Sequence, residues 1–228
     1  EQILRTIGDL ERLASKIAVG RISPREMVQL KIALQSIKPL KEQCLSTGNE
    51  VLAKWMQQLD DCETLSQRIE HEVKEDAPSM LNKGNVIAPG VNAELDELRE
   101  ISSHGKELLL KMQQREIENT GIPTLKISFN NVFGYYIEVT KTHVNKVPDT
   151  WIRKQTLVNA ERYITPELKE YEEKILGAED RIQELESDIY NTLLATAASY
   201  IKPIQLDARV ISHIDALISF ANIAITND

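Results

Sequence analysis

The sequence predicts a mainly α-helical fold, in which a long antiparallel helical lever or bundle carries a small β-rich module inserted at its tip. Apolar residues recur at steps of three and four over most of the 228 residues, which is typical of amphipathic helices. Alternating spacing, typical of strands, is confined to the segment between residues 125 and 163. Aromatic residues make up only 5% of the chain, which argues against a core built mainly of sheet.

The first part of the chain predicts short amphipathic helices. Residues 1–20 have one apolar stripe, which predicts a single amphipathic helix ending near Gly20. Ser23 and Glu26 stand at the spacing of a capping box, with Pro24 at the first helical position, so a second helix should begin there. Pro39 is expected to kink or end that second helix, because proline lacks the amide hydrogen that the helix interior needs.

Two further short helices, a loop and a long helix follow. Helical patterns occupy about residues 49–59 and 62–75. Residues 76–90 contain two Pro and two Gly, so we expect them to form the longest loop of the chain. From residue 91 to about 119 the apolar residues again share one side, which predicts a long helix.

The period of the pattern then changes to that of strands. Residues 125–129 and 135–140 alternate and are rich in β-forming residues, and residues 130–134 between them have the composition of a turn. This arrangement predicts a β-hairpin. A third strand is expected around residues 156–163.

A second long helix should begin at Pro166, with Thr165 as its N-cap. Its apolar residues follow a heptad-like seam, and from Pro166 to Ile201 it would measure about 54 Å at ~1.5 Å per residue. Pro203 is expected to end it, and residues 206–218 predict one more helix. Since neither long helix can bury its stripe alone, the two should pack antiparallel, with the β module at their tip.

The charge of the chain is unevenly distributed. The formal net charge is −8, yet residues 126–166 hold six of the 27 cations and only three of the 35 anions. This segment is therefore at +3 and the remainder at −11. A basic tip on an acidic stalk would direct DNA to the tip, while the plainer alternative is an ordinary solvated loop.

Several classes of function lack support in the sequence. Gly105-Lys106 is followed by Glu107, so no phosphate-binding loop of the P-loop type is present. The four His and two Cys are dispersed, and no catalytic constellation or metal site is evident. Two cysteines fit a reducing compartment. No uninterrupted apolar run approaches the roughly 20 residues of a membrane helix, so no membrane span is expected.

Four segments carry a resemblance to a known family. They are Phe133–Thr140 (Phe-Gly-Tyr-Tyr-Ile-Glu-Val-Thr), Arg153–Lys169 (Arg-Lys-Gln-Thr-Leu-Val-Asn-Ala-Glu-Arg-Tyr-Ile-Thr-Pro-Glu-Leu-Lys), Glu172–Leu176 and Ile7–Leu13. Together they strongly resemble the clamp and core regions of the MutS family of DNA mismatch-repair ATPases. The resemblance covers nearly the whole chain. The chain starts at Glu1 without an initiator Met, and we expect it to be a piece of a longer protein.

The resemblance implies a division into residues 1–116 and 168–228, the two parts of a core or lever domain, and residues 117–167, an inserted clamp domain. It implies that two subunits close their clamps around double-stranded DNA, and that levers connect the clamps to an ATPase domain. ATP and Mg²⁺ would belong to the full-length homodimer, so no cofactor and no catalysis are expected in this chain. Downstream mismatch-repair proteins would be further partners. A cytoplasmic location is implied, at the nucleoid when bound to DNA, with no membrane involved.

The resemblance and the local composition together nominate residues for contact with the DNA backbone. Such contacts are independent of sequence. Arg162 has an alternative role, pairing inside the module with Glu161 or Glu138. Tyr135, Tyr136 and Tyr163 are expected in the core of the module, because an intact duplex exposes no base faces for stacking. The candidates for DNA contact are, in order, Arg153 and Lys154, then Gln155, Thr156, Asn159 and Arg162, and finally Lys146 and Lys141.

Two other functions remain open from the sequence. A structural coiled-coil adaptor would bind protein partners along the acidic helices, and it would retain most of its function without residues 126–166. A helical arm that binds RNA would prefer an A-form duplex to B-form DNA.

Overall fold

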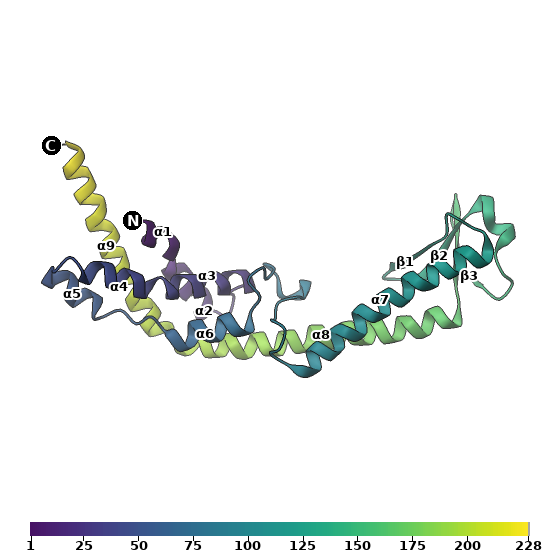
Figure 1. Cartoon of the computed structure of the whole chain (residues 1–228), viewed down its shortest axis with the longest axis horizontal. Coiled ribbons are helices and arrows are strands. Elements are labelled where there is room, and N and C mark those ends of the chain that lie inside the picture. Colours follow the sequence, from purple (N-terminus) through teal and green to yellow (C-terminus); the bar gives the residue numbers. More distant parts are fainter. Residues whose placement is uncertain (228) are drawn as a thin grey trace. The chain divides into compact units, whose positions relative to one another are not determined.

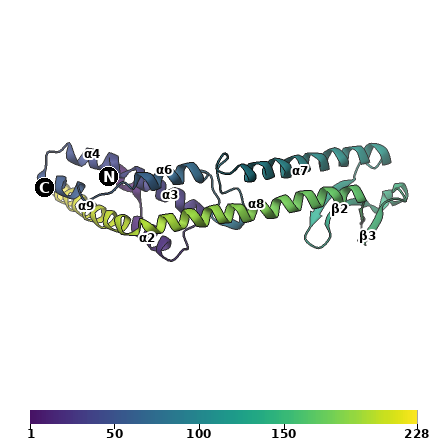
Figure 2. The ribbon, with the colours of Figure 1, turned by 90° about the horizontal axis from the view of Figure 1, so that it is seen from below.

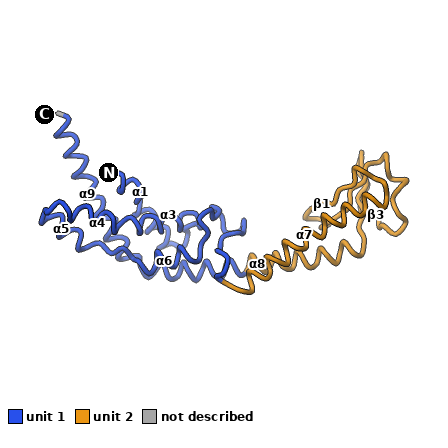
Figure 3. The backbone as a smooth tube through the Cα atoms, viewed as in Figure 1, with its two compact units in different colours: residues 1–91, 185–228 blue, residues 92–184 orange. Residues whose placement is uncertain are grey.

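A computed structural model describes residues 1–227. These residues form two compact units, one of residues 1–91 and 185–228 (unit 1) and one of residues 92–184 (unit 2) (Figure 3). Helices predominate and the strands form a single small antiparallel sheet, which confirms the predicted fold class. The two units are described in turn.

Unit 1 is helical. Helix α3 packs on α6, and α2 packs on α9. Its centre consists of fully buried aliphatic side chains such as Leu30, Leu34 and Ile69. The elements, labelled in Figure 1, are α1 (Gln2–Ile7), α2 (Leu10–Ala18), α3 (Pro24–Gln35), α4 (Ile37–Leu45), α5 (Glu50–Met56), α6 (Glu63–Glu72), a short 3₁₀ helix (Leu81–Lys83), the last part of α8 (Pro166–Ser199) and α9 (Ile201–Asn227).

The predicted start of the second helix is confirmed, but the single helix over residues 1–20 is wrong. The Ser23 hydroxyl accepts from the Glu26 amide, and the Glu26 carboxylate accepts from the Ser23 amide, so the capping box is complete. Gly8 has φ of +63° and separates α1 from α2. Asp9 then caps α2 by accepting from the amide of Arg12 at 2.9 Å. A left-handed glycine and a new cap end one helix and begin the next.

The two proline predictions are confirmed, and each helix ends four residues before its proline, at the carbonyl whose hydrogen bond the proline removes. Helix α3 ends at Gln35, before Pro39, and Pro39 lies in the first turn of α4. In the same way α8 ends at Ser199, and Pro203 lies in the first turn of α9. Proline fits a first turn because those amides have no partner within the helix. The predicted cap of α8 is confirmed, since the Thr165 hydroxyl accepts from the Leu168 amide at 3.1 Å.

Helix α9 is long and apolar enough to cross a membrane by length and composition alone, and the expectation of no membrane span stays a prediction. The segment that meets this criterion is Ile201–Thr226. Charged residues interrupt its apolar sequence. The core helix of a protein that does not span a membrane meets the same criterion. Ile204, Val210 and Ile214 of this helix are buried in unit 1.

Unit 2 contains α7 (Ala93–Thr120), the first part of α8 and a four-stranded antiparallel sheet in the order β1-β2-β4-β3. The strands are β1 (Lys126–Asn130), β2 (Gly134–Thr140), β3 (Ile152–Thr156) and β4 (Ala160–Ile164), with a 3₁₀ helix, Lys141–Lys146, after β2. The predicted hairpin is confirmed as β1 and β2. The predicted third strand is wrong, because residues 156–163 contain the turn between β3 and β4, closed by a 2.8 Å hydrogen bond from Leu157 N to Ala160 O.

The two helices of unit 2 lie side by side and antiparallel, as the sequence predicts (Figure 2). Arg115 pairs with Glu167 at 2.6 Å, Lys106 with Glu179 at 2.6 Å, and Glu94 with Arg181 at 2.9 Å. In these three pairs the residue numbers rise along α7 as they fall along α8, as expected of antiparallel helices. The core between helices and sheet consists of Leu109, Met112, Ile122, Leu125, Ile137, Val139, Trp151, Tyr163, Leu168 and Ile175.

The predicted domain boundaries, 1–116, 117–167 and 168–228, stay a prediction. The compact unit of residues 92–184 combines the sheet with α7 and the first part of α8. The sheet alone presents too little apolar surface for a core of its own, since Leu109, Met112, Leu168 and Ile175 of the two helices complete it.

Candidate nucleic-acid interface

The sheet of unit 2 has one face packed on the core and one face covered by polar side chains. Ile137 pairs in register with Tyr163, and both side chains enter the core. Their neighbours Glu138 and Arg162 also pair in register and therefore point to the opposite face. The packed face thus fixes the position of the edge strand β3 and of the turn between β3 and β4.

The turn between β1 and β2 is attached to α8 by two charged side chains. Lys169 donates to the Phe133 carbonyl at 3.2 Å and pairs with Glu172 at 2.6 Å. Glu172 accepts in turn from the Tyr135 amide. A Cβ atom on Gly134, whose φ is +74°, would lie 2.1 Å from Glu172 Oε2. The Phe-Gly-Tyr-Tyr motif therefore needs its glycine both for backbone conformation and for space.

Arg153, the first candidate, lies on the edge strand β3 with 61% of its side chain exposed. Its guanidinium contacts the carboxylate of Glu161 on β4 at 3.4 Å. Glu161 is buried and also accepts from the Tyr163 hydroxyl at 2.6 Å. This hydrogen bond and Arg153 lower the pKa of Glu161 against the opposing effect of burial. Burial, reinforced by Glu161, raises the pKa of Tyr163 to about 12.

Lys154, the second candidate, occupies an irregularity of strand β3. The register with β4 shifts between Arg153 and Gln155, so Lys154 is the extra residue of a β-bulge. Its side chain is exposed and forms no ion pair with any residue among 1–227. An unpaired cation beside Arg153 is available for an external anion.

Thr156, Asn159 and Lys141 gather at the end of the sheet where β3 turns into β4. All three are exposed. The Lys141 amide donates to the Asn159 carbonyl at 3.0 Å, which holds the start of the 3₁₀ helix against this turn. Lys141 is close enough to Glu161 to lower the pKa of that carboxyl, as Arg153 does. The structure thus brings Arg153 and Lys141 around one buried carboxylate.

Gln155 and Arg162 are engaged inside the module. Arg162 Nε donates to Glu138 at 3.0 Å, Nη1 donates to Gln155 Oε1 at 2.9 Å, and the guanidinium lies 4.3 Å from the ring centre of Tyr136. The internal partner is therefore Glu138 and not Glu161. Tyr136 is buried beneath this network, while Tyr163 belongs to the core and Tyr135 packs against it, as expected.

Lys146 lies apart from this cluster of exposed residues. Its ammonium donates to the carbonyl of Gly121, the residue that ends α7, at 3.2 Å. The sequence pattern does not show that Glu161 and Glu172 organise the site, because it reveals neither the contact of Arg153 with Glu161 nor the attachment of the β1–β2 turn to Glu172 on α8. Both carboxylates lie in segments that carry the resemblance, Glu161 in Arg153–Lys169 and Glu172 in Glu172–Leu176, and this was the available signal.

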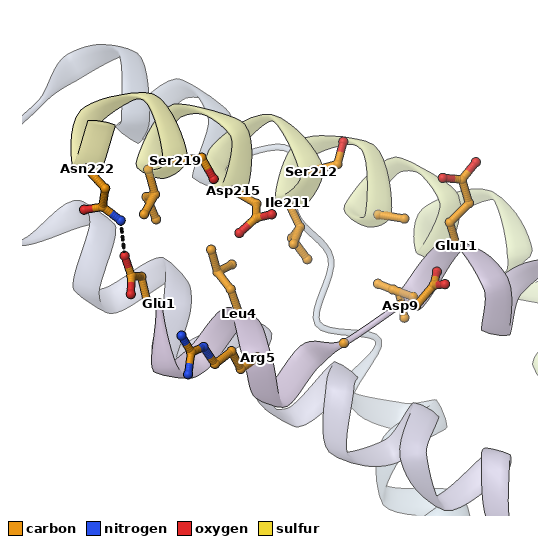
Figure 4. A pocket seen from close by; sticks show the side chains of 14 residues that line it. Glu1, Leu4, Arg5, Asp9, Glu11, Ile211, Ser212, Asp215, Ser219 and Asn222 are labelled. Carbon is orange, nitrogen blue, oxygen red and sulfur yellow. Dashed lines mark hydrogen bonds between the residues drawn. The ribbon is translucent and has the colours of Figure 1, made fainter. Parts of the chain in front are cut away.

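One cavity of unit 1 does not suit a nucleic acid. A cavity of about 570 Å³ in unit 1 lies between α1 and α9, with Asn222 bonded to Glu1 across it (Figure 4). Asp9, Glu11 and Asp215 line it, and acidic side chains repel phosphate. Within residues 1–227, no group of three or more His, Cys, Asp or Glu side chains could hold a metal ion.

Comparison with known proteins gives the family. Residues 90–181 match the model of MutS family domain IV. The DNA mismatch repair proteins MutS of Parabacteroides distasonis and Phocaeicola vulgatus are each 61% identical, over 98% and 100% of this chain, and that of Bacteroides fragilis is 58% identical over 100%. The chain belongs to the MutS family. It spans about a quarter of the length of these curated relatives, 26% of each.

The MutS match follows the architecture. The segment that matches MutS domain IV, residues 90–181, nearly coincides with the compact unit of residues 92–184. It also contains Phe133–Thr140 and Arg153–Lys169, the two strings that carry most of the resemblance in the sequence. The predicted membership of the MutS family is confirmed.

Proposed function

We propose that unit 2 is a clamp that holds double-stranded DNA by its phosphate backbone, as part of a longer MutS-type mismatch-repair protein. The observation that carries the proposal is the pair of exposed cations on strand β3. Arg153 has only a 3.4 Å contact to Glu161, and Lys154 has no ion pair among residues 1–227. Phosphate oxygens are the natural partners of such cations, and phosphate contacts are independent of sequence.

The other proposed contacts differ in how readily they can reach DNA. Thr156, Asn159 and Lys141 are exposed beside Arg153 and need no rearrangement. Gln155 and Arg162 would first have to leave the network around Glu138, so their contribution to DNA binding is proposed to be mainly through the support of β3. Lys146 would have to leave the Gly121 carbonyl.

The helix pair of unit 2 is proposed to act as a lever. Cross-helix ion pairs near both ends, Arg115 with Glu167 and Glu94 with Arg181, oppose sliding of α7 along α8. The close approach of Gly105 to Ile175 locks the middle. A pair held in this way moves as a rigid body, so it can couple the clamp to an ATPase domain in the longer protein.

The longer protein is proposed to be a homodimer that uses ATP and Mg²⁺, works with downstream mismatch-repair proteins and acts in the cytoplasm at the nucleoid. ATP and Mg²⁺ are proposed to bind other parts of the longer protein, since no P-loop motif occurs in the sequence and no carboxylate cluster suited to a metal occurs within residues 1–227. We therefore assign no chemical step to this chain.

The proposal is tested by binding of the 228-residue chain to a duplex of ~30 base pairs at low salt. The variant Arg153→Ala/Lys154→Ala removes the two exposed cations of β3. Lys111→Ala/Lys174→Ala is the matched control, since it removes two exposed cations from the helices of the same unit. Each lost phosphate contact should lower the slope of log affinity against log salt by about 0.9.

We expect the β3 variant to bind more weakly, with a slope lower by about 2, and the helix variant to bind like the parent chain. Equal affinity for matched and mismatched duplex is expected, because backbone contacts do not read bases. Equal losses in the two variants would show that the DNA surface lies elsewhere. A preference for A-form RNA would favour the RNA-binding arm instead.

A further inference from the structure

Unit 1 contains a second concentration of positive charge. Residues 12–25 include four cations, Arg12, Lys16, Arg21 and Arg25, and no acidic residue. The rest of unit 1 has ten cations against 18 anions. A basic segment within a unit of acidic balance creates a local field that attracts anions.

The fold brings these four cations around one shallow cavity of about 470 Å³. Arg12 and Lys16 are one turn apart on α2, Arg21 lies in the loop, and Arg25 is in the first turn of α3. The remaining lining residues are polar, namely Ser23, Glu26, Gln29 and Ser79. The cavity therefore has polar walls and a cationic majority.

Glu26 is the one anion of the cavity, and its oxygens are already occupied. Oε1 accepts from Arg12 at 2.7 Å and from Lys16, while Oε2 accepts from the amide and hydroxyl of Ser23 at 3.1 and 3.0 Å. Burial opposes its ionisation, but the hydrogen bonds from Lys16, Arg12 and Ser23 outweigh burial and lower the pKa of Glu26 to about 2. Glu26 therefore remains charged and fixes two of the cations in place.

The other two cations are free to bind. Arg21 and Arg25 are exposed, and neither side chain has a hydrogen bond or ion pair with any residue among 1–227. Ser79 and Gln29, also exposed, add a hydroxyl and an amide donor. The capping box already uses the Ser23 and Glu26 amides at the start of α3, so the available donors are mainly side chains.

We propose that this cavity binds a phosphate group, contributed either by the backbone of DNA or by a free phosphate-bearing molecule. Four cations against one anion leave a charge of +3 at the site. The guanidinium fork matches two phosphate oxygens at once, which favours phosphate over a monovalent anion. This site is in unit 1 and does not depend on the clamp proposed in unit 2.

The test compares two probes, inorganic pyrophosphate and a ~30-base-pair duplex, at low salt. Arg21→Gln/Arg25→Gln removes the free cations, and Lys38→Gln/Lys54→Gln removes two exposed lysines from the same unit as the control. Pyrophosphate binding is measured by titration calorimetry. Duplex binding is measured in the Arg153→Ala/Lys154→Ala background, so that the unit 2 site does not contribute.

We expect at least one probe to bind the parent at least tenfold more tightly than it binds the arginine variant, with the lysine variant within twofold of the parent. Loss confined to the duplex identifies the DNA backbone as the source, and loss with pyrophosphate identifies a free phosphate group. Equal binding by parent and arginine variant for both probes, or equal weakening in the lysine variant, would overturn the proposal. A Glu26→Gln variant should bind more tightly, because it releases Arg12 and Lys16; weaker binding in a variant of unchanged melting temperature would also count against it.

Discussion

Replacement of Gly134 by alanine should destabilise unit 2 strongly, although it adds only one methyl group. Gly134 joins the turn after β1 to strand β2, and its φ of +74° is one that side chains with a Cβ rarely adopt. The new methyl group would also meet the Glu172 carboxylate, at 2.1 Å from Oε2 and 2.4 Å from Cδ. Either the turn or the carboxylate has to move.

The two costs can be estimated separately. The left-handed conformation costs roughly 1–2 kcal/mol for a residue with a Cβ. Displacing Glu172 loses its hydrogen bond from the Tyr135 amide, and hydrogen bonds to charged groups contribute about 1.5–3 kcal/mol. The side chain of Glu172 can rotate toward Lys169, which recovers part of this second loss. We therefore expect a decrease of about 2–4 kcal/mol in the free energy of unfolding.

The assay is urea unfolding of the 228-residue chain, with Gly177→Ala as the matched control. Gly177 is in the interior of α8, and a Cβ there meets nothing within 4 Å. The control should stabilise by roughly 0.5–1 kcal/mol, because alanine favours helix. A change below ~0.5 kcal/mol in Gly134→Ala would refute the reasoning, as would no reduction of its effect in a Glu172→Ala background, where the steric conflict is gone.

Three further outcomes are expected. Burial raises the pKa of Asp207 from 3.8 to about 7, so the folded state binds a proton more tightly than the unfolded state. The protonated Asp207 therefore contributes to the stability of the folded state below pH 4, and this contribution is lost as the pH rises to about 7. In urea unfolding, Asp207→Asn should gain stability relative to the parent between pH 5 and 8, because the amide cannot ionise. Tyr190→Phe should cost about 1 kcal/mol in the same assay, because the buried hydroxyl donates to the Ile22 carbonyl at 2.9 Å. Glu161→Gln should tighten DNA binding, because it removes the anion that contacts the Arg153 guanidinium on β3. Glu138→Gln is the control, since it makes the same charge change on the other face of the sheet and should not tighten binding. Equal tightening in both variants would show that net charge alone explains the effect.

Features set by a few neighbouring residues could be predicted from the sequence. The capping box of Ser23 and Glu26, the Thr165 cap and the first hairpin each depend on local hydrogen bonds or on a local alternation. The motif Phe133–Thr140 identified the family for the same reason, since it is contiguous. The antiparallel pairing of the long helices followed from their order and from their stripes.

Features that depend on packing could not be predicted. An isolated glycine in a helical pattern is usually tolerated, so Gly8 gave no sign that its φ would become positive. The turn between β3 and β4 has no Asn-Gly or Asp-Gly signal, so the sequence predicts a single strand around residues 156–163 where the structure has two.

The candidate site shows the same limit. The sequence nominates Arg153 and Lys154 for DNA contact, and both are exposed in the structure. Composition could not reveal which side chains would pair with each cation of the module. Arg162 bonds Glu138 and Gln155 because the register of β2, β4 and β3 places these three side chains next to one another on one face of the sheet. That register is a property of the sheet as a whole, and a list of basic residues does not contain it.

The bulge in β3 has a consequence for how the chain behaves without DNA. Strand β3 is an outer strand, and the unpaired amides and carbonyls of such a strand can recruit a strand from another molecule and start aggregation. The irregular register at Lys154 and the two neighbouring charges obstruct this recruitment, while Ile152 and Val158, 53% and 84% exposed, would favour it. The charges of Arg153 and Lys154 are thus also expected to oppose pairing of this edge with another molecule. Sedimentation should therefore show more self-association for the Arg153→Ala/Lys154→Ala variant than for the parent at high protein concentration, and the binding assays are run below that concentration.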